Sequence, residues 1–348
     1  MSRLLVLLVL IAALPGAAAE FQGSARVWAG LGFDSNARRD YVSNGVGTQP
    51  DGFGFGLGQV EGLATFGDLF RVQGSYDIAG RKFLLLPSED TVVQSAQLEA
   101  RAAPRKWLEL GVLGHARDRR GAERDYSDLE GGALLDFLPD PALEVRLTLE
   151  AHRFIYWDRF DASWWGPDAQ LYARYRFTRR HSLSVFGQYN PRTYNANANE
   201  KGPDGLPVET STVRADTYFG AGLSYAYRGP FHFSLSYGYS DLTSNSYGET
   251  IRRHRLTATG AVHLPLDLTV LGSATLQLSS FPDGVYLSPE LTVIEDDENS
   301  SSVSVKVVRP LGEHFELDVR YAFYVNVLPN NQFLYLRHVA SVGVAFTW

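Results

Sequence analysis

The chain has 348 residues, no cysteine and a formal net charge of -7. The lack of cysteine excludes disulfide bonds and thiolate metal ligands, and the mildly acidic balance argues against a nucleic-acid partner. The mean hydropathy of -0.15 does not separate a water-soluble protein from a transmembrane barrel, because only every second residue of a barrel strand faces lipid.

The first 19 residues are typical of a secretory signal peptide. Arg3 gives a positive start, residues 4–14 form an apolar run, and residues 17–19 are three small alanines. The run is shorter than the roughly 20 residues that a membrane-spanning helix needs. We expect cleavage after Ala19, which leaves residues 20–348 as one domain and changes the net charge from -7 to -8 through the loss of Arg3.

Alternation of apolar and polar residues begins near Gly23 and continues to the end of the chain. In residues 143–152 one face holds Leu, Val and Ala, whereas the other holds two Glu, Arg, Thr and His. A helix would spread these charges around its surface, but a strand separates the two sets completely. The other clear segments are residues 96–102, 108–116, 169–177, 231–239, 268–278 and 315–323.

Short and long connections between these segments alternate. Seven short ones, rich in turn-forming residues, lie near 67–68, 104–105, 139–141, 178–180, 228–230, 264–265 and 310–312. Eight longer ones cover 35–52, 79–90, 117–125, 155–167, 190–212, 241–250, 279–299 and 326–332. This pattern predicts sixteen antiparallel strands with short periplasmic turns, long extracellular loops and periplasmic termini. Residues 285–294 could lengthen a hairpin, so fourteen and eighteen strands stay open.

A large soluble β-sandwich is the main alternative to a membrane barrel. The apolar faces extend over about nine to eleven residues, the length of a tilted membrane-spanning strand. The opposite faces carry charges at their centres, which a sandwich would bury. Aromatic residues also gather at strand ends, as in the girdles of outer-membrane barrels: Phe66, Phe137, Phe177, Tyr227, Phe231, Phe315 and Trp348 on the turn side, and Phe33, Phe53, Tyr76, Tyr189 and Tyr239 on the loop side. We therefore predict an all-β, up-and-down transmembrane barrel in the bacterial outer membrane.

About sixteen strands enclose an aqueous lumen, and parity predicts which side chains line it. The candidates are Arg71, Glu99, Arg101, Glu109, Asp128, Glu130, Glu144, Arg146, Glu150, His152, Tyr172, Arg174, Arg176, Tyr218, Glu316, Asp318, Arg320 and Tyr324. For any single charged pair we favour a cross-strand ion pair that stiffens the wall, with a hydrated solute path as the functional alternative. Mixed signs predict weak ion selectivity, and aromatic groups beside hydroxyls and amides suit sugars.

Several motifs give no catalytic assignment. Glycine alternates with Phe and Leu over residues 52–58, but a dinucleotide fingerprint needs a following helix. We expect a strand whose bare inner face is continued by Gly30 and Gly32. Residues 222–226 lack the final glycine and the histidine partner of a nucleophile elbow. We therefore predict no catalytic residue, no cofactor, no metal site and no enzymatic activity.

The predicted loops offer three further features. The third loop, residues 118–125, is brief, so a pore constriction would have to come from the first, fifth or seventh loop. The acidic run 295–299 could bind a divalent ion, although a solvated loop tip is the preferred interpretation. Four arginines could pair with the phosphates of lipopolysaccharide, or could simply be solvated: Arg117, Arg119, Arg120 and Arg124.

The last ten residues, 339–348, alternate up to the final Trp348. This ending resembles the terminal strand of bacterial outer-membrane β-barrels, which finishes on an aromatic residue. In that family the strand closes the barrel and is recognised by the barrel assembly machinery. The resemblance implies that Phe346 and Trp348 form the assembly signal.

A second resemblance concerns residues 27–37, whose sequence is Val-Trp-Ala-Gly-Leu-Gly-Phe-Asp-Ser-Asn-Ala. They are similar to the first strand and its exit in the barrel domains of exopolysaccharide-secretion porins. The resemblance implies polysaccharide export across the outer membrane. The periplasmic helical-repeat domain of those porins has no counterpart here, so a separate periplasmic polysaccharide-export protein is an expected partner. A general diffusion porin for small polar solutes, and a structural or adhesion barrel acting through its loops, stay open.

Overall fold

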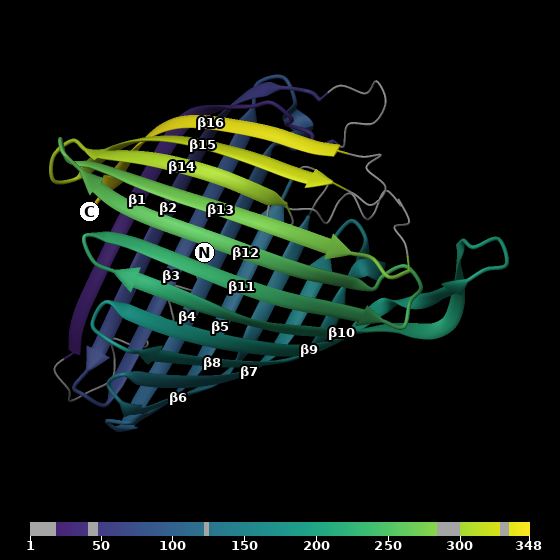
Figure 1. Ribbon diagram of the computed structural model, residues 1–348, viewed down its shortest axis with the longest axis horizontal. Helices are drawn as coiled ribbons and strands as arrows, with labels where there is room; N and C mark the ends of the chain where they lie inside the picture. The colour runs from purple at the N-terminus through teal and green to yellow at the C-terminus, as the bar shows by residue number, and fades with distance from the viewer. Residues whose placement is uncertain (1–18, 41–47, 122–124, 284–299, 328–333) are drawn as a thin grey trace.

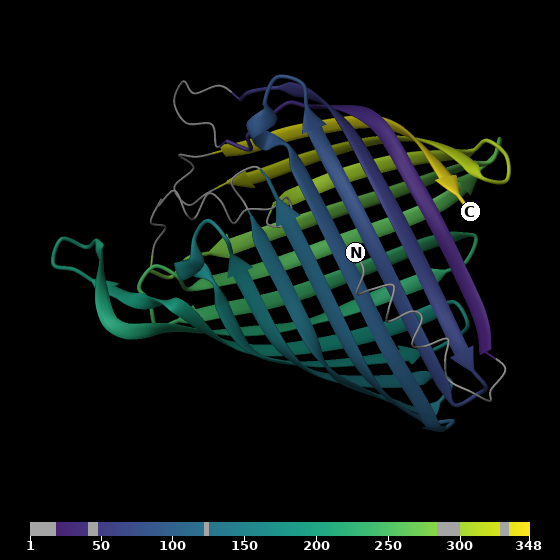
Figure 2. The ribbon, with the colours of Figure 1, turned by 180° about the vertical axis from the view of Figure 1, so that it is seen from behind.

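The computed structural model describes residues 19–40, 48–121, 125–283, 300–327 and 334–348. Over these ranges sixteen strands form a closed antiparallel barrel, in which each strand pairs with its neighbours in the sequence and β16 pairs with β1 (Figures 1 and 2). The prediction of a sixteen-stranded, up-and-down barrel is confirmed. None of the helices in these ranges is long and apolar enough to cross a membrane.

The strands are β1 (Ala19–Asp34), β2 (Asp51–Phe66), β3 (Phe70–Phe83), β4 (Thr91–Arg105), β5 (Leu108–Arg120), β6 (Tyr126–Asp140), β7 (Leu143–Tyr156), β8 (Trp164–Arg176), β9 (His181–Lys201), β10 (Pro207–Arg228), β11 (Phe231–Ser244), β12 (Ile251–Leu264), β13 (Leu268–Ser280), β14 (Ser301–Pro310), β15 (Phe315–Val327) and β16 (Leu334–Thr347). Two short 3-10 turns, η1 (Pro87–Glu89) and η2 (Phe160–Ala162), lie in the longer connections. We call the end with the short connections the turn end and the opposite end the loop end.

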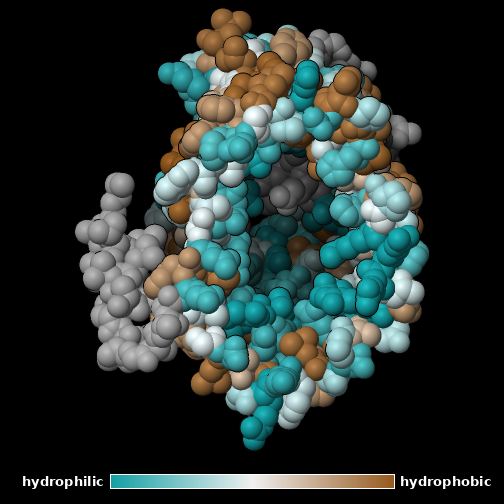
Figure 3. Space-filling view, turned by 90° about the vertical axis from the view of Figure 1, so that its left-hand side faces the viewer, coloured by the Kyte–Doolittle hydropathy of each residue, from teal (hydrophilic) through white to brown (hydrophobic). Residues whose placement is uncertain are grey.

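The period-two pattern places apolar side chains on the outside of the barrel and polar ones on the inside. Leu31, Val112 and Leu149 are more than half exposed on the outer surface. Polar groups such as Arg101 and Asp136 are buried against the inner wall. Viewed from the turn end, the barrel is hollow and the wall of the hollow is largely hydrophilic (Figure 3). A fold whose apolar residues face outward needs an apolar environment around it.

The first and last strands close the barrel, and the part of β1 that pairs with β16 is residues 26–34. Arg26 pairs with Thr347 and Asp34 pairs with Val339. At the turn end the backbone N–H groups of Ala25 and Trp348 each donate to the other residue's carbonyl, at 2.9 and 2.8 Å. The ladder therefore continues to the last residue of the chain, where the Trp348 side chain is exposed.

The predicted fifth loop, residues 190–212, is largely strand. β9 continues to Lys201 and β10 starts at Pro207, so residues 202–206 make the connection. The hairpin projects beyond the rest of the loop end (Figure 1). These residues lack apolar alternation because they leave the barrel wall, but their backbones still pair, with register shifts between Glu209 and Ala215. The sequence pattern therefore missed this extension.

The prediction for the glycines of β2 was wrong. Phe53 lies opposite Gly32 and Phe55 opposite Gly30, and directly opposed residues share a face. The two phenylalanines therefore point inward, and the glycines of residues 52–58 point outward. A Cβ atom on Gly30 would lie 2.6 Å from the Phe55 ring, so Gly30 makes room for that ring. Phe53 is also buried, so it does not belong to the predicted outer girdle.

Four predictions fall wholly or partly outside the described residues. Of the predicted signal peptide, residues 1–19, only Ala19 is described, and it is the first residue of β1. The segment 285–294 and the acidic run 295–299 also lie outside. In the third loop, residues 122–124 are not described, and β5 extends to Arg120 on its near side. Cleavage after Ala19 stays a prediction.

Candidate functional site

A belt of paired charges crosses the inner wall from β3 to β8. Its centre is Asp136 on β6, which lies between Arg101 of β4 and Arg146 of β7. Arg146 donates to both oxygens of Asp136, at 2.6 and 2.9 Å, and Arg101 donates to Oδ2 of the same carboxylate. The carboxylate is thus shared by two guanidinium groups, which compensates for its burial.

The belt continues in both directions around the wall. Arg101 also contacts Glu99 and, at 3.3 Å, Glu109. Three further residues belong to the belt. Arg71 lies 2.7 Å from Glu109, Glu144 lies 3.7 Å from Arg146, and Arg174 donates to Glu144. The alternating signs leave little unbalanced charge along the belt. The cross-strand ion pairs that the sequence favoured are present at these positions.

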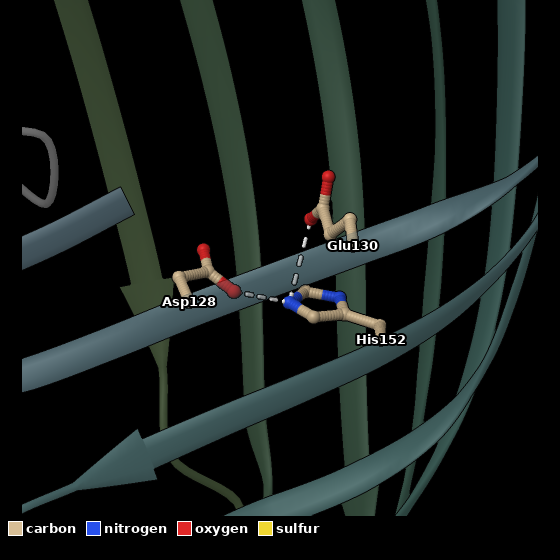
Figure 4. A group of neighbouring side chains, drawn as sticks. All are labelled: Asp128, Glu130 and His152. Atoms are coloured by element: carbon tan, nitrogen blue, oxygen red, sulfur yellow. Dashed lines mark hydrogen bonds and ion pairs between the residues drawn. The ribbon is translucent and has the colours of Figure 1, made fainter. Parts of the chain in front are cut away.

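A second group lies nearer the loop end and contains histidine. Asp128 and Glu130 are two residues apart on β6, and His152 of β7 pairs directly with Glu130. Nε2 of His152 lies 2.6 Å from Oδ1 of Asp128 and 3.3 Å from Oε1 of Glu130 (Figure 4). Nδ1 of His115, on β5, lies 3.8 Å from Oε2 of Glu130. These donors can bind a proton or a metal ion.

Two buried carboxylates flank this group from β7 and β8. Glu150 and Asp168 pair across the two strands, and Oδ2 of Asp168 lies 3.9 Å from Nδ1 of His152. Gln188 of β9 donates to Oδ2 of Asp168 at 2.6 Å. Asp168 was not among the predicted lumen residues, because the predicted strand began at residue 169, whereas β8 begins at Trp164. The alternation of Trp164, Gly166 and Asp168 was the signal that could have extended it.

Arginines stack on aromatic rings at the loop end of β8 to β10. The Arg192 guanidinium lies 4.2 Å from the ring centre of Trp164 and 5.1 Å from that of Tyr218. Arg214 lies 4.0 Å from the ring centre of Tyr194. Of these residues, Tyr218 was predicted from the sequence to line the lumen. Trp164, Arg192 and Tyr194 lie in the predicted loops 155–167 and 190–212, and Arg214 lies just beyond the second of these.

Deeper in the lumen, aromatic rings lie beside hydroxyl groups on the same strands. Tyr172 of β8 lies within hydrogen-bonding distance of Ser184 of β9, with 3.0 Å between their hydroxyl oxygens. The Phe186 ring lies close to Gly222 and Gly238 and stays 43% exposed. The inner wall therefore offers both flat apolar faces and hydrogen-bonding groups.

The opposite wall carries the remaining predicted lumen residues. Glu316 of β15 lies 2.7 Å from Arg26 of β1, and Asp318 lies 3.7 Å from Lys306 of β14. Arg320 lines the wall beside Lys306, and the Tyr324 ring centre is 5.6 Å from the Arg337 guanidinium. These four predicted residues belong to a different part of the wall from the belt.

The turn end carries a basic cavity near β8, β9 and β10. It includes the predicted lumen residue Arg176, and its other arginines are Arg174, Arg179, Arg180 and Arg228. Asp140 is the acidic residue of the lining. On the outside of the same end the Phe346 ring packs against Phe315, with 5.1 Å between ring centres. The two predicted assembly residues thus lie on the outer face, away from the lumen.

Comparison with known proteins gives structural likeness alone. No protein-family model and no curated protein sequence matches the chain. OmpT, an outer-membrane protein of Vibrio cholerae, superposes with a TM-score of 0.51 at 10% identity, covering 96% of this chain and 99% of that one. A variant of it without loop L8 gives 0.50 at 10% identity, covering 95% and 100%. The chain therefore has the fold of a bacterial outer-membrane β-barrel.

Proposed function

We propose that the protein is an integral outer-membrane β-barrel that acts as a channel, with both termini in the periplasm. The observation that carries the proposal is the hollow, hydrophilic lumen inside an apolar outer surface (Figure 3). A barrel of sixteen strands is wide enough for a water-filled channel. The outer-membrane fold of the comparison structures supports the same location.

For the solute we propose a polysaccharide on its way out of the cell. Phe186 offers an exposed ring to the lumen, and Tyr172 with Ser184 adds hydroxyl groups nearby. Sugars have apolar faces and hydroxyl edges, so a wall with both kinds of group suits them. At the turn end the arginines around residues 176–180 would attract an acidic polymer, or an acidic periplasmic export protein that delivers it.

Two measurements test the channel and its cargo separately. In planar bilayers the purified barrel is expected to give a stable conductance with weak ion selectivity, since the charges of the belt are mixed in sign and paired. If the purified barrel shows no conductance, the proposal that it is a channel is wrong. In the native bacterium, deletion of the gene is expected to remove surface polymer while small-solute uptake stays normal. Unchanged polymer with reduced uptake would favour a general diffusion porin instead.

The projecting β9–β10 hairpin favours a second candidate function, adhesion. It extends beyond the barrel rim, where an outside partner could reach it (Figure 1). Its connection, residues 202–206, lies farthest along the hairpin, between Lys201 and Pro207. Shortening the hairpin between residues 195 and 213 is expected to leave conductance unchanged. If it abolishes surface attachment while export stays normal, adhesion is the better assignment.

A further inference from the structure

The strand register places three metal-ligating side chains together on the inner wall. Asp128 and Glu130 face inward because residues two apart on a strand share a face. His152 shares that face because it pairs directly with Glu130. The three side chains converge at one place although they come from two strands (Figure 4).

Their donor atoms are close enough to share one ion. One atom from each of the three side chains lies within 4.8 Å of the other two. Zn²⁺ binds nitrogen and oxygen ligands at about 2.0–2.2 Å, so two ligands of one ion stand roughly 3–4 Å apart. Small rotations of these side chains are therefore enough to enclose a cation. His152 is mostly buried, which limits competition from water.

A separate observation is that two buried carboxylate oxygens beside the three side chains lack a hydrogen-bond donor in the part of the chain that the structure describes. Asp168 is 3% exposed and Glu150 is 8% exposed, yet Oδ1 of Asp168 and Oε1 of Glu150 have no hydrogen-bond partner among the described residues. Asp168 reaches toward His152 Nδ1, which has no hydrogen-bond partner either. Buried carboxylate oxygens without partners are costly, and a bound cation removes much of that cost.

Asp168 also has the position of a supporting residue. A histidine that binds a metal through Nε2 carries its proton on Nδ1 and usually donates it to a carboxylate. Oδ2 of Asp168 lies 3.9 Å from that nitrogen and is held from the other side by Gln188. A slight shift of the imidazole would complete the hydrogen bond. Asp168 would then position His152 without touching the metal.

We propose that Asp128, Glu130 and His152 bind one divalent transition-metal ion of the Zn²⁺ type in the barrel wall, and that Asp168 positions His152. One imidazole and two carboxylates suit Zn²⁺ and similar ions, whereas Ca²⁺ takes six to eight oxygen ligands. The ion would tie β6 to β7 and stiffen the lumen wall. This site is independent of what the channel carries.

The test uses the full barrel in detergent, without a histidine tag and stripped with EDTA. Zn²⁺ is titrated by calorimetry, and Co²⁺ is added to follow its visible absorption. The expected result is one ion per barrel, with affinity at least tenfold weaker in His152→Gln and in Asp128→Asn. His263→Gln is the matched control, because His263 is exposed at the turn end and bonded to Thr269. Its affinity is expected to equal that of the wild type.

Folding is checked by heat-modifiable migration in gels, so that misfolding is not mistaken for lost ligands. If His152→Gln does not fold, Glu130→Gln provides the same test with a near-isosteric change. Asp168→Asn is expected to weaken Zn²⁺ binding less than loss of a ligand and to alter the Co²⁺ spectrum. The proposal is overturned if the wild type binds no Zn²⁺, if folded ligand variants bind it equally well, or if equimolar Ca²⁺ displaces it.

Discussion

At the end of β1, both carboxylate oxygens of Asp34 share the single Nε–H of Arg337 on β16, each at 3.0 Å, and Nη2 of Arg337 donates to Oδ2 at 2.5 Å. Both side chains are fully buried. Nearby, Nδ2 of Asn36 donates to the Leu336 carbonyl at 3.2 Å. The Asp-Ser-Asn sequence that begins at the last residue of β1 therefore joins the first and last strands at the loop end of the barrel.

Replacing Asp34 with Asn should strongly destabilise the barrel. The change leaves the buried Arg337 charge without its main partner, which typically costs about 3–5 kcal/mol. Urea unfolding in detergent, followed by gel migration, measures the loss. The control is Glu316→Gln, because its pair with Arg26 is partly exposed on both sides and should contribute about 0–1 kcal/mol. Equal losses in the two variants would contradict the assignment.

Deletion of Trp348 should impair assembly without changing the pore. Its backbone forms the last hydrogen bonds between β16 and β1, and its side chain lies outside the lumen. We expect less folded protein in the outer-membrane fraction. The molecules that do assemble should keep the wild-type single-channel conductance. Trp348→Phe, which keeps an aromatic end, should assemble normally; a failure of this variant would show that the aromatic character is not what matters.

A pair of glycine substitutions tests the inward packing of Phe55. A Cβ atom on Gly30 would lie 2.1 Å from the Val342 carbonyl oxygen and 2.6 Å from the Phe55 ring, so Gly30→Ala should cost about 1–3 kcal/mol. Gly56 faces outward with nothing within 4 Å, so Gly56→Ala should change the free energy of unfolding by no more than about 0.5 kcal/mol. The free energy of unfolding of both variants is measured by chemical denaturation. A larger loss in Gly56→Ala than in Gly30→Ala would mean that the inward and outward faces of β1 and β2 are assigned the wrong way round.

Charge reversal at the basic turn-end cavity tests the entry of an acidic polymer. Arg179→Glu with Arg180→Glu changes two exposed side chains of the β8–β9 turn, so the barrel should fold normally. Surface polymer, measured on whole cells, should fall several-fold because the local field changes sign. Arg105→Glu with Lys106→Glu makes the same change at the β4–β5 turn and should have little effect. Similar losses at both turns would point to a general effect of charge.

Arg101, beside the central Asp136 of the belt, should control both stability and ion selectivity. Arg101→Gln leaves Glu99, Glu109 and Asp136 with less compensation, and breaking a buried pair costs about 3–5 kcal/mol. Bilayer recordings should also show a shift toward cations, since one positive charge leaves the wall. An unchanged reversal potential in folded protein would mean that the belt does not face the conducting path.

Much of the fold could be predicted because the alternation of apolar and polar residues along each strand depends only on the local sequence. The period of two in residues 143–152 separates lumen from lipid face, and turn-forming residues mark the strand ends at the turn side. The pairing of Arg26–Asp34 with the last strand also followed, because a closed up-and-down barrel leaves these two strands adjacent. The β9–β10 extension was missed because strands that leave the membrane no longer alternate in polarity.

The sequence by itself determined the fold class and the charged inner faces, because each depends on neighbouring residues, and it favoured sixteen strands over fourteen or eighteen. Only the tertiary structure decided which face of β2 turns inward, since alternation defines two faces without saying which one is buried. It alone brought Asp168 of β8 beside His152 and Arg337 onto Asp34. Those contacts join residues 16 and 303 positions apart, and strand register and barrel closure set them.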